Sequence, residues 1–331
     1  MTREGKGRAA FIILLAIVLL FGRSWSVQAA ESKLFIVKGD LHCHSNFSVD
    51  SEVPVQQVIQ ESRLAGYDFI ALTEHNTLRH LATDWSTPEM VVLSGYELTI
   101  SPVAHVNVFG LRDFERKTAI YTEAEMAEYL DYLHKEGALL QLNHPNDVKY
   151  YSRFGYDYNI DFLEIANGNW RADDRKTLQD YQELLCQGRK LVATGGTDAH
   201  RNYKVRKVYN CVLVAEKTEK AILEGLAAGR NYVTVAANGP VISLQCGDTL
   251  MGGTVTYQEG QTVNIRIDNL MPGTIIKVYT SNGLKINQVY NAMDYSPYVK
   301  DVSTKGIKFC RVELWFDQEN ICAYSNPIYI Q

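Results

Sequence analysis

Short apolar runs alternate with amphipathic segments over the first two thirds of this 331-residue chain. The runs at 90–93, 138–142 and 190–194 are bounded by Gly, Asn or Pro. Apolar runs of about four to eight residues with such boundaries are typical of buried strands. The first two thirds therefore predict a sheet that is covered on both faces.

Three amphipathic segments predict helices between these runs. Residues 54–65 begin with a proline suited to a first helical turn and end before a glycine. Thr122 and Glu125 form the pattern of a capping box, which opens a helix that stops at Gly137. Residues 175–187 repeat the arrangement. Strand, helix and strand in succession predict parallel βα units.

The pattern changes after Pro240. Helical spacing disappears, and Gly-punctuated runs remain at 255–257, 262–267 and 310–316. Such runs predict a β-sandwich. We therefore expect an α/β domain at residues 33–236 and a small all-β domain at 240–331, which suits a chain longer than one small domain usually holds.

The N-terminus has the pattern of a secretory signal peptide. Basic residues precede an apolar run of 13 residues at 9–21, and Val27 and Ala29 place small residues before a cleavage site. We expect residues 1–29 to be removed and the protein to be secreted or extracytoplasmic; the alternative is an uncleaved N-terminal anchor. Removal takes four basic residues and one acidic residue, which shifts the net charge from −5 to about −8. So acidic a chain argues against a nucleic-acid partner.

Six cysteines lie in the predicted exported chain, where disulfides are permitted. Two alternatives remain open. One is a disulfide in the tail that joins Cys246 to Cys310 or Cys322. The other is six buried thiols that act as small apolar residues.

Five clusters of histidine and carboxylate residues follow the apolar runs. They are Asp40-Leu41-His42-Cys43-His44, Thr73-Glu74-His75-Asn76, Gly95-Tyr96-Glu97, Leu142-Asn143-His144-Pro145 and Gly196-Thr197-Asp198-Ala199-His200. Residues i and i+2 of an extended segment face the same side, so His42 and His44 can share one ion while Cys43 faces away. Asp198 and His200 have the same spacing. Ligands that gather at several strand ends are typical of a multinuclear metal hydrolase.

Other candidate ligands are ambiguous when taken alone. Glu97 follows an apolar run where a strand enters a loop, and its two oxygens can bridge two cations, but a solvated loop residue fits equally. His105 lies in the alternating run 104–109 and is either a ligand or a core histidine. Asp50 is either a ligand or the N-cap of the next helix. His134 fits the last turn of a helix, and His80 fits a flanking loop, so neither is assigned to the site.

The ordered clusters resemble those of the PHP (polymerase and histidinol phosphatase) superfamily of metal-dependent hydrolases. The resemblance covers residues 38–234 and, more loosely, the tail, whose segment 325–329 is similar to that of the CehA/McbA-type subgroup. It implies a distorted (β/α)7 barrel with two to three divalent ions, commonly Zn, Mn or Fe. Amidohydrolase barrels also begin with His-x-His, but they usually need a carboxylated lysine as the bridge, which Glu97 replaces here.

The resemblance also implies which residues hold each ion. His42, His44, Glu97 and Asp198 would hold the first ion; Glu97, His105 and His144 the second; and Asp50, His75 and His200 the third. The position of Asp50 is often a histidine in the family, and an oxygen ligand favours manganese or iron over zinc. The tail contains no histidine, so we expect it to supply no ligand.

Two adjacent cations acidify a shared water and neutralise charge on the departing oxygens, which predicts a metal-bridged hydroxide as the nucleophile. We assign catalytic roles to Glu97, Asp198 and His200, and substrate binding to Asn167, Arg171 and Arg201, since arginines grip anionic groups. The first functional hypothesis is a phosphoesterase that acts on small molecules. The alternatives are a hydrolase of carboxylic or carbamic esters or amides, and a metal-stabilised surface-binding protein without catalysis.

Overall fold

The computed structural model describes residues 34–331 except 101–103, 114–121, 154 and 202–207. The predicted signal peptide at 1–29 therefore lies outside the described residues. Within the described part of the chain, none of the helices combines the length and the apolar content that a bilayer span requires.

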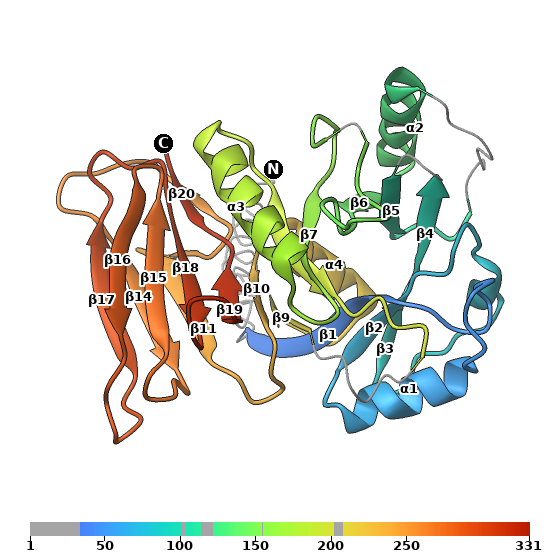
Figure 1. Cartoon of the computed structure of the whole chain (residues 1–331), viewed down its shortest axis with the longest axis horizontal. Helices are drawn as coiled ribbons and strands as arrows, with labels where there is room; N and C mark the ends of the chain where they lie inside the picture. The colour runs from blue at the N-terminus through green and yellow to red at the C-terminus, as the bar shows by residue number, and fades with distance from the viewer. Residues whose placement is uncertain (1–33, 101–103, 114–121, 154, 202–207) are drawn as a thin grey trace, which may run out of the picture. The chain divides into compact units, whose positions relative to one another are not determined.

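Two groups of strands build the part of the chain before residue 236 (Figure 1). In the first group, β1 lies between β2 and β9, with β3 beyond β2 and β10 beyond β9. These strands are β1 (Phe35–Cys43), β2 (Phe69–Leu72), β3 (Val91–Leu93), β9 (Tyr209–Val214) and β10 (Asn231–Thr234). The second group is a five-stranded sheet in sequence order: β4 (Gly95–Ile100), β5 (Ala104–Phe109), β6 (Leu139–Leu142), β7 (Phe162–Asn167) and β8 (Val192–Gly196).

Four α-helices and one 3₁₀ helix connect these strands: α1 (Val55–Leu64), η1 (Arg79–Ala82), α2 (Glu123–Lys135), α3 (Ala172–Cys186) and α4 (Glu219–Ala227). The predicted capping box is present, since the Thr122 hydroxyl accepts the Glu125 N–H and the Glu125 carboxylate accepts the Thr122 N–H. Helix α3 begins three residues earlier than predicted. The Asp174 carboxylate accepts the N–H of Arg171 at 2.6 Å, which satisfies the backbone at the start of this helix.

The two groups of strands meet at their edges through isolated bridges. His75 pairs with Glu97, which joins the end of β2 to β4, and Cys43 pairs with Ala199, which joins β1 to the segment after β8. These bridges lie at the predicted metal ligands. The continuous ladders among the described residues do not close a barrel, and the (β/α)7 barrel therefore stays a prediction.

Asparagine side chains cover the outer edge of β8 where no strand pairs with it. Asn210 donates to the Gly195 carbonyl at 2.6 Å and accepts the Gly195 N–H at 3.1 Å. Asn231 donates to the Ala193 carbonyl, and Asn326 accepts the Ala193 N–H at 2.7 Å. Buried backbone groups require such partners. A residue of the tail, Asn326, thus supports a strand that leads to the predicted ligands Asp198 and His200.

The tail is all-β, as the sequence predicts. Its strands are β11 (Val241–Cys246), β12 (Thr249–Leu250), β13 (Thr254–Val255), β14 (Thr262–Asp268), β15 (Ile275–Thr280), β16 (Gly283–Val289), β17 (Tyr298–Ser303), β18 (Phe309–Trp315), β19 (Ile321–Ser325) and β20 (Ile328–Ile330). Strands β11, β12, β14 and β17 form a separate sheet, whereas β19 pairs with β10 and continues the first group of strands. Hydrogen bonds therefore cross the boundary predicted near residue 240, and the independence of the tail stays a prediction.

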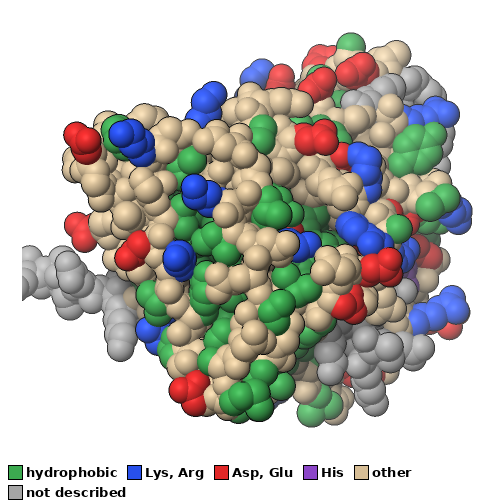
Figure 2. Space-filling model, turned by 60° about the vertical axis from the view of Figure 1, so that its left-hand side comes forward, with side chains coloured by type: hydrophobic (Ala, Val, Ile, Leu, Met, Phe, Trp, Pro, Cys, Tyr) green, Lys and Arg blue, Asp and Glu red, His purple; other side chains and the backbone are tan. Residues whose placement is uncertain are grey.

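Strand β16 forms one edge of its sheet and exposes apolar side chains, among them Leu284 and Val289. Figure 2 shows hydrophobic side chains gathered in the middle of one face of the molecule. All six cysteines are free, so of the two alternatives the one without a tail disulfide is observed. Five of them are buried, and Cys186 is exposed.

Candidate metal centre

Strand ends from both sheets bring the predicted ligands together. His42 and His44 lie at the end of β1, where both side chains are fully buried, and Cys43 faces the core as expected. Glu97 lies inside β4 rather than in a loop, because pairing with β5 continues to Ile100. His105 stands near the start of β5, which runs antiparallel to β4 and β6. That reversed direction brings the N-terminal end of β5 to the same side as the C-terminal end of β6.

Glu97 is the centre of the cluster, and its side chain is 1% exposed. Its Oε1 lies 3.0 Å from His105 Nδ1, 3.3 Å from His42 Nε2 and 3.6 Å from His144 Nε2. Its Oε2 lies 2.8 Å from His75 Nδ1 and 3.6 Å from His44 Nε2. Each carboxylate oxygen therefore faces a different set of histidines, which is the arrangement that a bridging carboxylate needs.

Four overlapping groups of donor atoms are close enough to share an ion. Within each group the donor atoms all lie within 4.8 Å of one another: His42, His44 and Glu97; Glu97, His105 and His144; His42, His144 and Asp198; and His44, His75 and His200. Imidazole nitrogens with carboxylate oxygens are the donors that Zn, Mn and Fe accept. The residues present fit a multinuclear site.

Asp50 closes the side of the cluster that faces solvent. Its Oδ2 lies 3.1 Å from both His75 Nε2 and His200 Nε2, although the side chain is about half exposed. Asp198 stands between His42, His44 and His200, with its Oδ1 at 3.3–3.5 Å from each. The structure thus brings all nine predicted ligand residues into one cluster.

The electrostatics of the cluster suit metal binding. Burial alone would lower the pKa of His42, but the carboxylates of Glu164, Asp198 and Glu97 raise it well above its ordinary value. Burial would raise the pKa of Glu97, but His42 and His105 hold it well below its ordinary value. A cation that displaces the proton from His42 would occupy the same negative field, because metal ligands bind in their deprotonated forms.

Glu164 is a buried carboxylate that sequence reasoning missed. It lies in β7, and its Oε1 is 2.9 Å from His42 Nδ1. Its Oε2 accepts the His144 N–H at 3.0 Å. With Nδ1 engaged, His42 turns Nε2 toward Glu97, and this buried atom has no hydrogen-bond partner among the described residues. An acidic residue inside the apolar run 162–166 was the available signal.

Comparison with known proteins supports this interpretation. A sequence profile described as PHP domain matches residues 40–228, which is more than half of the chain. The chain belongs to the PHP family. Curated protein sequences gave no significant match.

Solved structures show the same fold at low sequence identity. A two-domain protein from Bacteroides vulgatus, described as containing a predicted PHP-like metal-dependent phosphoesterase, is 18% identical, with a TM-score of 0.50; the match covers 89% of this chain and 95% of that one. PsfC from Pseudomonas syringae is 17% identical over 54% of this chain and 82% of its own, with a TM-score of 0.41. Endonuclease Q, in complex with duplex DNA, is 16% identical over 58% and 56%, with a TM-score of 0.43.

In this PHP protein, a histidine ligand held by a second-shell carboxylate resembles an arrangement that fixes ring orientation and raises ligand basicity. We therefore expect Glu164→Gln to weaken metal affinity about 10- to 100-fold. Competition with a chromogenic chelator measures this affinity directly. Glu183→Gln, which changes an exposed carboxylate on α3, is the matched control. Equal affinities in the two variants would show that Glu164 does not orient His42.

The predicted substrate-binding residues have different surroundings. Arg171 is paired with Asp173 at 3.1 Å and with Asp147 at 3.3 Å, so its charge is already compensated. Asn167 is buried, and its amide donates to Glu164 at 3.1 Å and to Asp198 at 3.4 Å. Arg201 is exposed. The contacts of Asn167 and Arg171 indicate support of the site rather than capture of an anion.

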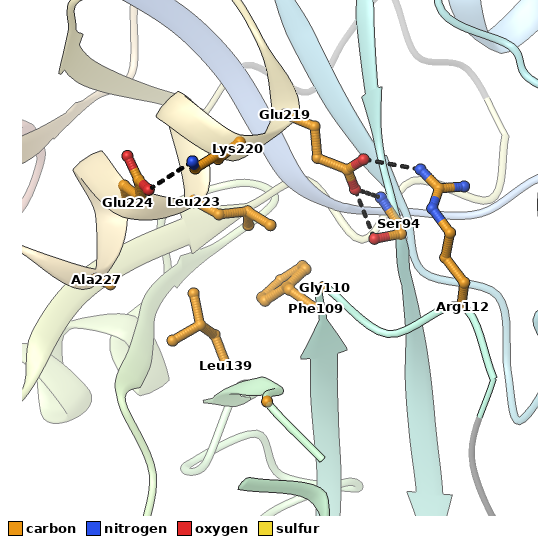
Figure 3. A pocket seen from close by; sticks show the side chains of 11 residues that line it. Ser94, Phe109, Gly110, Arg112, Leu139, Glu219, Lys220, Leu223, Glu224 and Ala227 are labelled. Carbon is orange, nitrogen blue, oxygen red and sulfur yellow. Dashed lines mark hydrogen bonds and ion pairs between the residues drawn. The ribbon is translucent and has the colours of Figure 1, made fainter. Parts of the chain in front are cut away.

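A second cavity, of about 440 Å³, lies at the opposite ends of the strands (Figure 3). His105 stands near the start of β5, whereas Gly110, which lines this cavity, follows the end of that strand. The Glu219 carboxylate accepts the N–H and hydroxyl of Ser94, both at 2.5 Å, and an N–H of Arg112 at 2.8 Å. Because these polar groups satisfy one another, we do not assign metal chemistry to this cavity.

His80 is a buried histidine outside the cluster. It is fully buried in η1, and neither ring nitrogen has a hydrogen-bond partner among the described residues. Burial lowers its pKa to about 4. The unfolded chain therefore binds this proton more readily, so the stability that neutral His80 allows is present above about pH 6.5 and is lost as the pH falls through about 4.

We expect His80→Leu to reduce the loss of stability between pH 6.5 and 4 by up to about 3 kcal/mol. Urea unfolding of native and variant protein at both pH values, in chelator so that metal release does not contribute, measures the difference. An identical loss in both proteins would mean that His80 is not the group that titrates.

Proposed function

We propose that this PHP protein is an exported, metal-dependent phosphoesterase that acts on small phosphate esters. The observation that supports it best is the position of Glu97, whose two oxygens face separate sets of histidines at 2.8–3.6 Å. A pair of ions on either side of one carboxylate is suited to in-line displacement at phosphorus. The acidic composition favours a small-molecule substrate over nucleic acid.

The assignment of residues to ions follows the groups of donor atoms. We infer that His42, His44, Glu97 and Asp198 hold one ion, and that Glu97, His105 and His144 hold a second. Asp50, His75 and His200 would hold a third. When bound, such ions acidify a water molecule for attack and neutralise charge on the phosphate oxygens.

The side chains of this chain then have separate tasks. Glu164 and Asn143 fix the inner ligands, since Asn143 donates to Glu97 Oε1 at 2.9 Å and Glu164 orients His42. His200 lies at the more open side, where its side chain is 25% exposed and Asp50 contacts Nε2. It is placed to give a proton to the leaving alkoxide, while the buried residues exclude bulk water.

A hydrolase of carboxylic or carbamic esters or amides, as the resemblance to the CehA/McbA-type subgroup implies, is the second candidate. One observation favours it: Arg171 is paired with two aspartates, which removes one of the two arginines expected to bind an anion. A neutral ester does not need that charge.

We expect protein purified without chelator to contain at least two metal ions per chain, because the donor groups overlap at Glu97. Elemental analysis measures the content, and assays of phosphomonoesters, phosphodiesters and aryl carboxylic esters with Zn, Mn or Fe distinguish the two candidates. Full activity in chelator from protein without metal would contradict both. Hydrolysis of carboxylic esters alone would select the second candidate.

A further inference from the structure

The loop after His144 is held beside the metal ligands by its own backbone and by α3. Asp147 Oδ1 accepts the N–H of Lys149 at 2.8 Å and of Tyr150 at 2.9 Å, which fixes a tight turn. Its Oδ2 lies 3.3 Å from the guanidinium of Arg171. Arg171 therefore positions this loop, which explains why its charge is compensated although it lies near the site.

The turn places an aromatic ring against two predicted ligands. The Tyr150 ring centroid is 5.2 Å from that of His105, at an interplanar angle of 33°. It is 6.3 Å from that of His144, with an edge-on geometry. Tyr150 is nevertheless 46% exposed. A ring that touches the ligands of the second ion and also faces solvent forms one wall of the entrance to the site.

A cation accompanies this ring. Lys149 Nζ lies 4.6 Å from the Tyr150 ring centroid, and the lysine is exposed. Its flexible side chain can leave the ring without breaking an ion pair with any described residue. The wall therefore combines an aromatic surface, which binds flat apolar groups, with a positive charge, which binds anions.

We propose that Tyr150 and Lys149 determine specificity, by receiving a substrate that has a planar apolar leaving group and an anionic head. This inference rests on the proposed function and names the substrate class as aryl phosphate esters. The leaving group packs against Tyr150, while the phosphate lies toward Glu97 and Lys149 adds attraction for its charge. Tyr150 contacts the leaving group and takes no part in the proton transfers.

Two phosphonates that resist hydrolysis test the proposal. Phenylphosphonate and methylphosphonate share a head group and differ in the apolar part. In metal-loaded native protein, we expect calorimetry to find phenylphosphonate bound about tenfold more tightly, since an aromatic pair contributes up to about that factor. In Tyr150→Ala the ratio should fall toward one, while the Kd of methylphosphonate changes little.

Tyr151→Ala is the matched control, because Tyr151 is the next residue and is 49% exposed. It should keep the native ratio. Lys149→Ala should weaken both phosphonates by a similar factor of up to about five, and Lys149→Arg should restore binding. For aryl phosphate hydrolysis, Tyr150→Ala should raise KM more than it lowers kcat.

The outcomes separate this inference from the proposed function. A ratio near one in native protein, or a ratio that Tyr150→Ala leaves unchanged, overturns the specificity role and leaves the phosphoesterase proposal intact. Equal loss in Tyr151→Ala and Tyr150→Ala also overturns it, because the effect would then belong to the loop as a whole. Failure of both phosphonates to bind metal-loaded protein contradicts the proposed function and this inference with it.

Discussion

Replacing Glu97 with Gln is expected to lower turnover by about a hundredfold or more, because its charge sits where a site with several cations needs a shared ligand. Its two oxygens lie within 3.6 Å of five histidine nitrogens. An amide of the same shape offers one neutral oxygen and one donor nitrogen in their place. Metal content should fall below that of the native protein.

Folding of the Glu97→Gln variant should persist, since the amide has nearly the same volume as the carboxylate. Activity, elemental analysis and a thermal melt on the same preparation separate the effects, with Glu128→Gln, an exposed change on α2, as the control. Near-native turnover with full metal content would remove Glu97 from the bridging role.

Local patterns predicted a large part of the fold. The helix at 54–65 and the capping box at Thr122 were correct because hydrophobic spacing and capping depend on residues close in sequence. The cluster of ligands was predicted for a related reason. In an extended strand, His42 and His44 must share a side, and strands that run in parallel bring their C-terminal ends to one edge.

Contacts between distant segments could not be read in this way. The antiparallel direction of β5 decides how His105 reaches Glu97, and it depends on pairing with β4 and β6. Glu164 reaches His42 across 122 positions of the sequence. Periodicity identifies which face of a strand is apolar, but it does not identify the neighbouring strand.

The largest difference concerns the tail. Composition indicated an independent domain after Pro240, because helical spacing ends there. The structure instead joins β19 to β10 and directs Asn326 at β8. On the other face of the same region, the Tyr324 hydroxyl donates to the Thr194 carbonyl at 2.7 Å and accepts the Ala166 N–H at 3.2 Å. The tail therefore contacts both strands that carry Glu164 and lead to Asp198.

We expect Asn326→Ala to lower the free energy of unfolding by about 3–5 kcal/mol, because it strips partners from several buried polar groups. The Asn326 amide oxygen accepts the Ala193 N–H at 2.7 Å, and its nitrogen donates to Ala193 and Asn231 at 2.8–3.1 Å. A methyl group replaces none of these bonds. Urea unfolding in chelator measures the change, and Asn287→Ala, on the exposed strand β16, is the control.

The same variant tests whether the tail is independent. If residues 240–331 fold alone, Asn326→Ala should unfold the tail in a separate transition and leave metal affinity unchanged. If the shared strands form one cooperative unit, a single transition should move to lower urea, and metal affinity should fall because β8 no longer holds Asp198 and His200 in place. The hydrogen bonds of Asn326 across the predicted boundary favour the second outcome, and two transitions with native metal affinity would contradict it.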